Sequence, residues 1–188
     1  MAAIAPQITF RSSPHFDERP SATDVSLLVI HNISLPAGKF ADTPEHSFID
    51  ALFMGTLDCT AHASFAGLQG VRVSAHCVIW RDGRIFQYVP FEKRAWHAGI
   101  SQFAGRERCN DFSIGIELEG CDDLPYTDEQ YQSLILLTKF IMSQHPAITI
   151  ERIVGHCDIA PGRKTDPGTA FDWMRYRDTV VEWDKQRD

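Results

Sequence analysis

Short apolar runs rich in β-branched residues recur along the chain and predict strands. They lie at residues 26–32, 71–80, 84–90, 112–120 and 151–157. Only Arg-Asp-Gly separates the second run from the third, which indicates a tight turn between antiparallel strands. The pattern therefore predicts a sheet that contains at least one β-hairpin.

The fourth run has a regular alternation of apolar and polar positions. Ile114, Ile116 and Leu118 alternate with a glycine and then with Glu117 and Glu119. Successive side chains of a strand point to opposite faces, so this segment is predicted to be a strand with one polar face. Two interpretations remain open for the glutamates. Either they face solvent from an edge strand, or they lie in apolar surroundings that disfavour the charged form of a carboxylate and suit a general base.

Three segments have the spacing of helices, at residues 47–55, 127–145 and from about 171 to 183. The second carries a continuous apolar stripe, and Thr127 with Gln130 forms a capping-box pattern at its start. Strands outnumber these helices. We therefore expect the α/β (α+β) class, with a mixed central β-sheet flanked by helices.

The chain has 188 residues without repeats, low-complexity tracts or linker-like composition. That length suits one globular domain with a full hydrophobic core. We expect a single domain over residues 1–188, with roughly 13 N-terminal and roughly five C-terminal residues peripheral to it.

Charge and cysteine content narrow the class of protein. The formal net charge is -7, whereas non-specific phosphate binding requires a basic face, so nucleic acid is not expected as a partner. Five cysteines without a CxxC pair do not indicate a disulfide framework or a thiolate zinc site. The first ten residues lack a basic start and a long apolar stretch, and no apolar run approaches membrane-spanning length. We expect a cytoplasmic protein without a membrane partner or an evident obligate protein partner.

Two histidines stand where predicted strands end. His31 follows the first apolar run and His156 follows the last, while Asp166 comes ten residues later, beyond a Pro- and Gly-containing loop. A hydrolytic zinc site takes three protein ligands of these types and leaves a position for water. The alternative is that both histidines are hydrogen-bonded core residues and Asp166 is a turn residue. Spacing alone favours that alternative.

Other polar side chains near these positions are candidates for chemistry. Lys164 lies two residues before Asp166 and could stabilise negative charge on a carbonyl oxygen, although most lysines are solvated surface charges. Arg72 and Arg163 could bind a substrate carboxylate through paired hydrogen bonds. If residues 151–157 continue as a strand, Cys157 points away from His156 and packs, and we expect Asp158 to cap the following turn.

Long ordered motifs in this chain resemble the zinc-dependent N-acetylmuramoyl-L-alanine amidases. Within them the chain is most similar to the cytoplasmic 1,6-anhydro-N-acetylmuramyl-L-alanine amidases, the AmpD type. The resemblance covers residues 14–177. The motifs are LLVIHNISLP, VSAHCVIWRDG, RAWHAG, GRERCNDFSIGIELEG and GHCDIAPGRKTDPG.

The resemblance implies one zinc ion held by His31, His156 and Asp166, with Glu117 as general base and Lys164 as stabiliser of the tetrahedral intermediate. It implies the mixed sheet shared with peptidoglycan recognition proteins. The implied reaction is hydrolysis of the amide between the lactyl group of 1,6-anhydro-N-acetylmuramic acid and L-alanine in muropeptides. That reaction belongs to peptidoglycan recycling in Gram-negative bacteria and lowers a signal that induces β-lactamase.

Substrate contacts are also implied by the resemblance, because several residues stand in matching segments. They are Asn32, Arg72, Trp96, His97 and Arg163. For His97 a structural, hydrogen-bonded role is an equal alternative.

Two other functions are possible for this fold, a peptidoglycan-binding recognition module and an amidase acting on intact peptidoglycan. The complete set of zinc and catalytic candidates favours an enzyme over a recognition module. The lack of a signal-peptide pattern and the odd number of cysteines argue against an amidase that acts on intact peptidoglycan.

Overall fold

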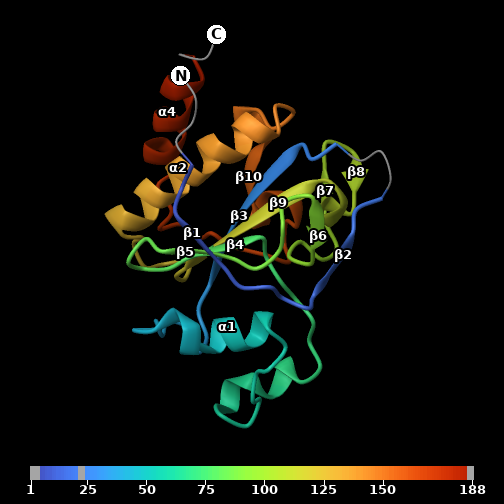
Figure 1. Cartoon of the computed structure of the whole chain (residues 1–188), viewed down its shortest axis with the longest axis vertical. Coiled ribbons are helices and arrows are strands. Elements are labelled where there is room, and N and C mark those ends of the chain that lie inside the picture. The colour runs from blue at the N-terminus through green and yellow to red at the C-terminus, as the bar shows by residue number, and fades with distance from the viewer. Residues whose placement is uncertain (1–4, 21–23, 186–188) are drawn as a thin grey trace.

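A computed structural model of the chain describes residues 5–20 and 24–185. Its centre is a six-stranded sheet in the order β1-β5-β4-β9-β3-β10 (Figure 1). Only β4 and β5 pair antiparallel, and the other neighbours are parallel. The strand bounds are β1 Ile8–Phe10, β3 Leu27–Ile33, β4 Cys77–Ile79, β5 Ile85–Gln87, β9 Ser113–Glu119 and β10 Ile153–Gly155. The mixed sheet flanked by helices confirms the predicted fold class.

Smaller elements complete the architecture. Two ribbons pair β2 with β6 and β7 with β8. Their bounds are β2 Phe16–Glu18, β6 Lys93–Ala95, β7 Gln102–Phe103 and β8 Arg106–Glu107. The helices are α1 Phe48–Phe53, α2 Asp128–Gln144, α3 His156–Ile159 and α4 Trp173–Asp184, with 3₁₀ turns η1 Pro44–His46, η2 Ala63–Leu68, η3 Cys109–Asp111 and η4 Ile150–Arg152. Within the described residues, none of these helices has both the length and the apolarity needed to cross a membrane.

The two faces of the sheet are covered differently. Ile30 and Ile116 belong to a large apolar cluster with the buried faces of α2 and α4. On the other face, Val78 packs with α1 residues such as Phe53, while Val29 belongs to a third cluster. Figure 1 shows α2 and α4 on one side of the sheet and α1 on the other. The polar site described below lies on the α1 side, where the apolar cover is divided between two clusters.

Most predicted elements are confirmed, with shorter strands in the hairpin. The capping box of Thr127 and Gln130 is present at the start of α2. The prediction of a strand over residues 151–157 is right only for Ile153–Gly155, because η4 extends to Arg152 and His156 begins α3. Asp158 lies inside α3 and accepts a hydrogen bond from the Gly155 amide at 2.7 Å, so it caps the start of this helix rather than the turn that follows it. The strand argument that placed Cys157 opposite His156 is therefore also wrong.

Strand β9 lies inside the sheet rather than at its edge. It pairs with β3 on one side and β4 on the other, and all seven of its residues are buried. The open question about Glu117 and Glu119 is thereby answered, since neither faces solvent from an edge strand. Both carboxylates are enclosed by protein, where a charged group is costly unless it has a partner.

Candidate active site

Strand register places the first two site residues side by side. His31 of β3 and Glu117 of β9 are direct partners in the parallel pair. Partners in adjacent parallel strands present their side chains to the same face of the sheet. The pairing of β3 with β9 alone therefore places a candidate metal ligand next to the candidate base.

Three donor atoms converge beside Glu117. The Nδ1 atoms of His31 and His156 are 3.0 Å apart, and each lies 3.0 Å from Oδ2 of Asp166. Across residues 5–20 and 24–185 this is the one group of three or more His, Cys, Asp or Glu donors with metal-binding spacing. Donors of a tetrahedral zinc ion, each about 2.0–2.2 Å from the metal, lie about 3.3–3.6 Å apart. The observed triangle is close to that size.

The loop after α3 returns Asp166 to His156. The amide of Cys157 donates to the carbonyl of Asp166 at 3.0 Å. The carbonyl of Pro167 accepts hydrogen bonds from Asn32 Nδ2 and the Tyr126 hydroxyl. Gly168 has a φ of +81°, and a Cβ there would lie 2.1 Å from the backbone of Asp122. The loop thus needs a glycine at this position and polar anchors from distant segments.

The protonation states of the three residues fit a divalent zinc ion. Burial lowers the pKa of His31 to about 4, so its imidazole is neutral at physiological pH. The Nε2 atom of His156 lies 3.1 Å from the carbonyl of Ala98, which can only accept, so Nδ1 of a neutral His156 carries the lone pair. Burial tends to raise the pKa of Asp166, but the facing imidazoles outweigh it and lower that pKa below its usual range. Two imidazoles and one carboxylate are a typical zinc donor set.

Glu117 has the surroundings expected of a general base. Its side chain is buried at 9% exposure, and among the described residues Oε2 has no hydrogen-bond partner. Burial and then the charge of Asp166 raise the pKa of Glu117 well above its usual value, while Lys164 lowers it. A buried carboxylate with an unused oxygen is costly for stability, and such groups concentrate at functional sites.

A cavity of about 210 Å³ adjoins the donor triangle. Its lining includes Asn32, Trp96, His97, Glu117 and Lys164, so the structure brings both catalytic candidates and three of the five predicted substrate contacts to one place. The indole nitrogen of one of them, Trp96, donates to Asp17 at 3.1 Å, which fixes that wall.

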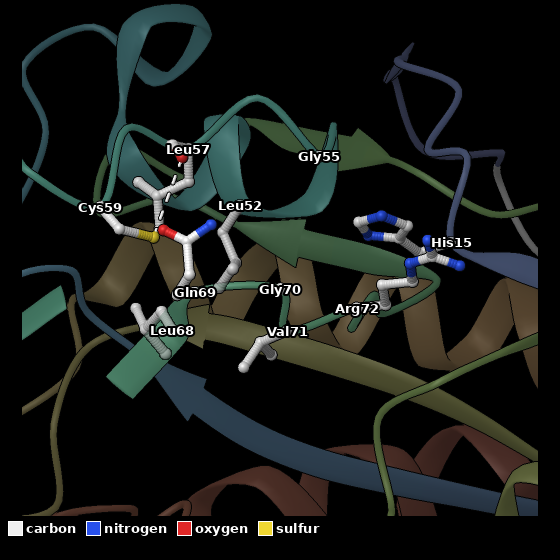
Figure 2. A pocket seen from close by; sticks show the side chains of 10 residues that line it. All are labelled: His15, Leu52, Gly55, Leu57, Cys59, Leu68, Gln69, Gly70, Val71 and Arg72. Carbon is white, nitrogen blue, oxygen red and sulfur yellow. Dashed lines mark hydrogen bonds between the residues drawn. The ribbon is translucent and has the colours of Figure 1, made fainter. Parts of the chain in front are cut away.

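The two predicted arginine contacts lie outside this cavity. Arg163 Nη2 donates to the carbonyls of Ala98 and Ile100, each at 2.7 Å, and lines a neighbouring hollow of about 500 Å³. Arg72 lines another hollow, of about 210 Å³, with His15 near it and Cys59 at the opposite end (Figure 2). Their role in substrate binding stays a prediction.

Sequence reasoning missed the residues that hold the site in place. Tyr126 and Asp122 anchor the Asp166 loop from the segment after β9. Ser113 and Gly115 lie on the polar face of β9 beneath His97, and a Cβ on Gly115 would meet the His97 ring at 2.5 Å. The alternation along β9 was the available signal, because it placed these two residues on the same face as Glu117.

Comparisons with known proteins identify the family. A family model described as N-acetylmuramoyl-L-alanine amidase matches residues 21–169. The 1,6-anhydro-N-acetylmuramyl-L-alanine amidase AmpD of Citrobacter freundii is 61% identical over 169 residues, covering 90% of this chain and 88% of that protein. The Escherichia coli K12 protein of that name is 61% identical over 165 residues, covering 88% and 87%.

Solved structures give the same result. The crystal structure of a selenomethionine derivative of AmpD has a TM-score of 0.88 at 58% identity and covers 95% of this chain and 97% of its own. A complex of the Escherichia coli amidase AmiD with anhydro-N-acetylmuramic acid-L-Ala-D-γ-Glu-L-Lys has a TM-score of 0.61 at 31% identity, covering 88% of this chain and 65% of that one. The fold, the site and the extent of these matches lead to one assignment: the chain belongs to the N-acetylmuramoyl-L-alanine amidase family.

Proposed function

We propose that this amidase hydrolyses the amide between the lactyl group of 1,6-anhydro-N-acetylmuramic acid and L-alanine in muropeptides, using one zinc ion. The observation that carries the proposal is the buried Oε2 of Glu117 beside the three-donor cluster, an atom without a hydrogen-bond partner among the described residues. The names of relatives that match nearly the whole chain support the choice of substrate. AmiD, which shares the fold, has been solved with a substrate of this chemical class.

His31, His156 and Asp166 would hold the zinc ion. When bound, zinc supplies Lewis acidity that activates water and polarises the carbonyl to be attacked. The three side chains need little adjustment, because their donor atoms already converge and the imidazole of His31 is neutral. Burial of both histidines excludes competing water from the far side of the site.

Glu117 takes a proton from the attacking water and later delivers it to the departing amine of L-alanine. A base works best when its pKa lies close to the operating pH, and burial shifts the pKa of Glu117 in that direction. Its free oxygen needs no bond to be broken before it accepts the proton.

Lys164 stabilises the negative charge that develops on the carbonyl oxygen. Its ammonium group belongs to an exposed side chain at the cavity, so it can reach a bound substrate without leaving a buried position. Positive charge close to the carbonyl oxygen on which negative charge develops stabilises the transition state more than the ground state. Asn32 and Trp96 would position the sugar or lactyl group from the cavity wall, and Arg72 and Arg163 would bind more distant carboxylates of the peptide.

We further propose that the enzyme acts in the cytoplasm on recycled muropeptides and thereby lowers a signal for β-lactamase induction. The decisive test compares hydrolysis of purified anhydro-muropeptide with hydrolysis of intact peptidoglycan sacculi, alongside a zinc analysis of the protein. We expect one zinc per chain and release of L-alanine-linked peptide from the anhydro-muropeptide. Binding without cleavage and without zinc would indicate a recognition module, and cleavage confined to sacculi would indicate a wall amidase.

A further inference from the structure

The imidazole of His97 links a predicted zinc ligand to the sheet. Its Nδ1 lies 2.9 Å from Nε2 of His31, the ring nitrogen that faces away from the donor triangle. Its Nε2 lies 3.2 Å from the hydroxyl of Ser113 on β9. His31 and Ser113 are buried at 1% and 0% exposure. The three side chains form a chain of hydrogen bonds that starts at the site and ends inside the protein.

The position of the His97 ring is built into the backbone around it. A Cβ on Gly115 would lie 2.5 Å from Cγ and Nδ1 of His97, so the ring occupies the space that a side chain would fill. Oδ1 of Asn110 accepts hydrogen bonds from the amides of both His97 and Ala98. The same backbone segment then presents the carbonyl of Ala98 to Nε2 of His156 at 3.1 Å. Two consecutive residues thus contact the outward nitrogens of both histidine ligands.

The hydrogen-bond chemistry fixes where the protons lie when the site holds zinc. A ligating His31 must present the lone pair of Nδ1, so its single ring proton is on Nε2. His97 must then accept that proton's hydrogen bond at Nδ1. A neutral His97 therefore carries its own proton on Nε2 and donates it to the hydroxyl oxygen of Ser113.

We propose that His97 and Ser113 are positioning residues that hold His31 in the tautomer whose Nδ1 can bind zinc. The inference rests on the proposed zinc site and extends it beyond the three ligands. Groups that orient a metal-bound imidazole from behind typically contribute 10–100-fold in metal affinity. His97 also lines the cavity, so its contact with His31 is a second role beside the predicted substrate contact.

Two nearly isosteric substitutions separate hydrogen bonding from packing. In His97→Asn, Oδ1 can take the place of Nδ1 and still accept from His31. In His97→Leu the shape is similar but there is no acceptor. We expect His97→Leu to weaken zinc binding about 10–100-fold and His97→Asn to weaken it only about threefold.

Ser113→Ala tests the far end of the chain of hydrogen bonds. Without the hydroxyl acceptor, His97 is free to place its proton on Nδ1, where it opposes the proton of His31. We expect zinc affinity to fall less than in His97→Leu, by about three- to tenfold.

The primary measurement is the zinc dissociation constant from chelator competition at fixed pH, with thermal unfolding of each zinc-free variant as a control for folding. Nitrogen-15 NMR of zinc-loaded wild type provides a second readout and should show a protonated Nε2 on His31. Equal losses in His97→Asn and His97→Leu, or a protonated Nδ1 on His31, would overturn the inference while leaving the zinc site intact. A wild-type protein that binds no zinc would instead overturn the proposed function.

Discussion

Two carboxylates on one face of β9 have opposite surroundings. Glu117 and Glu119 are two residues apart, and both are buried, at 9% and 1% exposure. Glu119 is fully engaged, because Oε1 accepts from the amide of Ala41 at 2.7 Å and Oε2 from the amide of Arg81 at 3.2 Å. In the described part of the chain, Oε2 of Glu117 has no such partner and lies beside the donor cluster.

The comparison shows that burial alone does not make a carboxylate functional. Burial is the largest cause of a raised pKa at both residues, but the amides of Ala41 and Arg81 act against it at Glu119. Glu119 uses both oxygens to join the segment before α1 to the turn after β4, which is a structural role. Glu117 keeps an oxygen available for a proton. The partners of a buried acid, more than its depth, indicate what it does.

The largest expected effect is on catalysis at Glu117. Glu117→Gln keeps the shape but cannot accept a proton, so kcat should fall about 10²–10⁴-fold. The free energy of unfolding should stay the same or rise, since an unpaired buried acid is removed. Kinetics on anhydro-muropeptide and urea unfolding measure the two quantities. Glu119→Gln is the matched control, and a comparable loss of kcat there would contradict the distinction.

Lys164→Met should have the next largest effect. Loss of the positive charge at the cavity should lower kcat about 10²–10³-fold. Because Lys164 also lowers the pKa of Glu117, the acid limb of the kcat/KM profile should move to higher pH in this variant. The pH profile checks the second effect independently of the first. An unchanged acid limb would show that Lys164 does not act on the base.

Local patterns in the sequence predicted much of this fold, but they did not predict the contacts that distinguish Glu119 from Glu117. The alternation in β9 and the apolar stripe and capping box of α2 depend on neighbouring residues, so they could be recognised directly. The partners of Glu119 come from distant segments, at Ala41 and Arg81. The sequence alone does not show that these distant segments approach Glu119 in the folded protein.

The metal candidates illustrate the same limit. His31 and His156 could be placed at strand ends, but spacing alone favoured a structural role, and only the resemblance to a family joined them with Asp166. The start of α3 at His156 depends on Asp158 and on the carbonyl of Asp166, ten residues away. The apolar pattern of a strand does not show where that strand ends when its end depends on contacts with a loop further along the chain.

Glu119→Ala should lower stability without removing the catalytic groups. The amides of Ala41 and Arg81 would lose their acceptor, and each unsatisfied donor costs about 1–3 kcal/mol when it is buried. Two of them would cost about 2–6 kcal/mol, and because both amides are only partly buried we expect a loss at the lower end of that range. Urea unfolding measures this loss. Glu119→Gln retains one acceptor oxygen and should lose about half as much. Equal stability of wild type and Glu119→Ala would show that water replaces the carboxylate at no cost.

The smallest expected effect is the pH dependence of the contribution of Glu119 to stability. Its pKa in the folded protein is raised above the ordinary value of 4.5, mainly by burial, so the folded state holds the proton more tightly than the unfolded chain. This contribution is fully present below pH 4.5 and is lost as pH rises through the folded-state pKa, with a slope of at most about 1.4 kcal/mol per pH unit. The difference in unfolding free energy between wild type and Glu119→Gln isolates this term, because the other titrating groups cancel. That difference should shift in favour of the variant as pH rises from 4.5. A shift in favour of wild type would mean that the amides of Ala41 and Arg81 outweigh burial and hold Glu119 ionised.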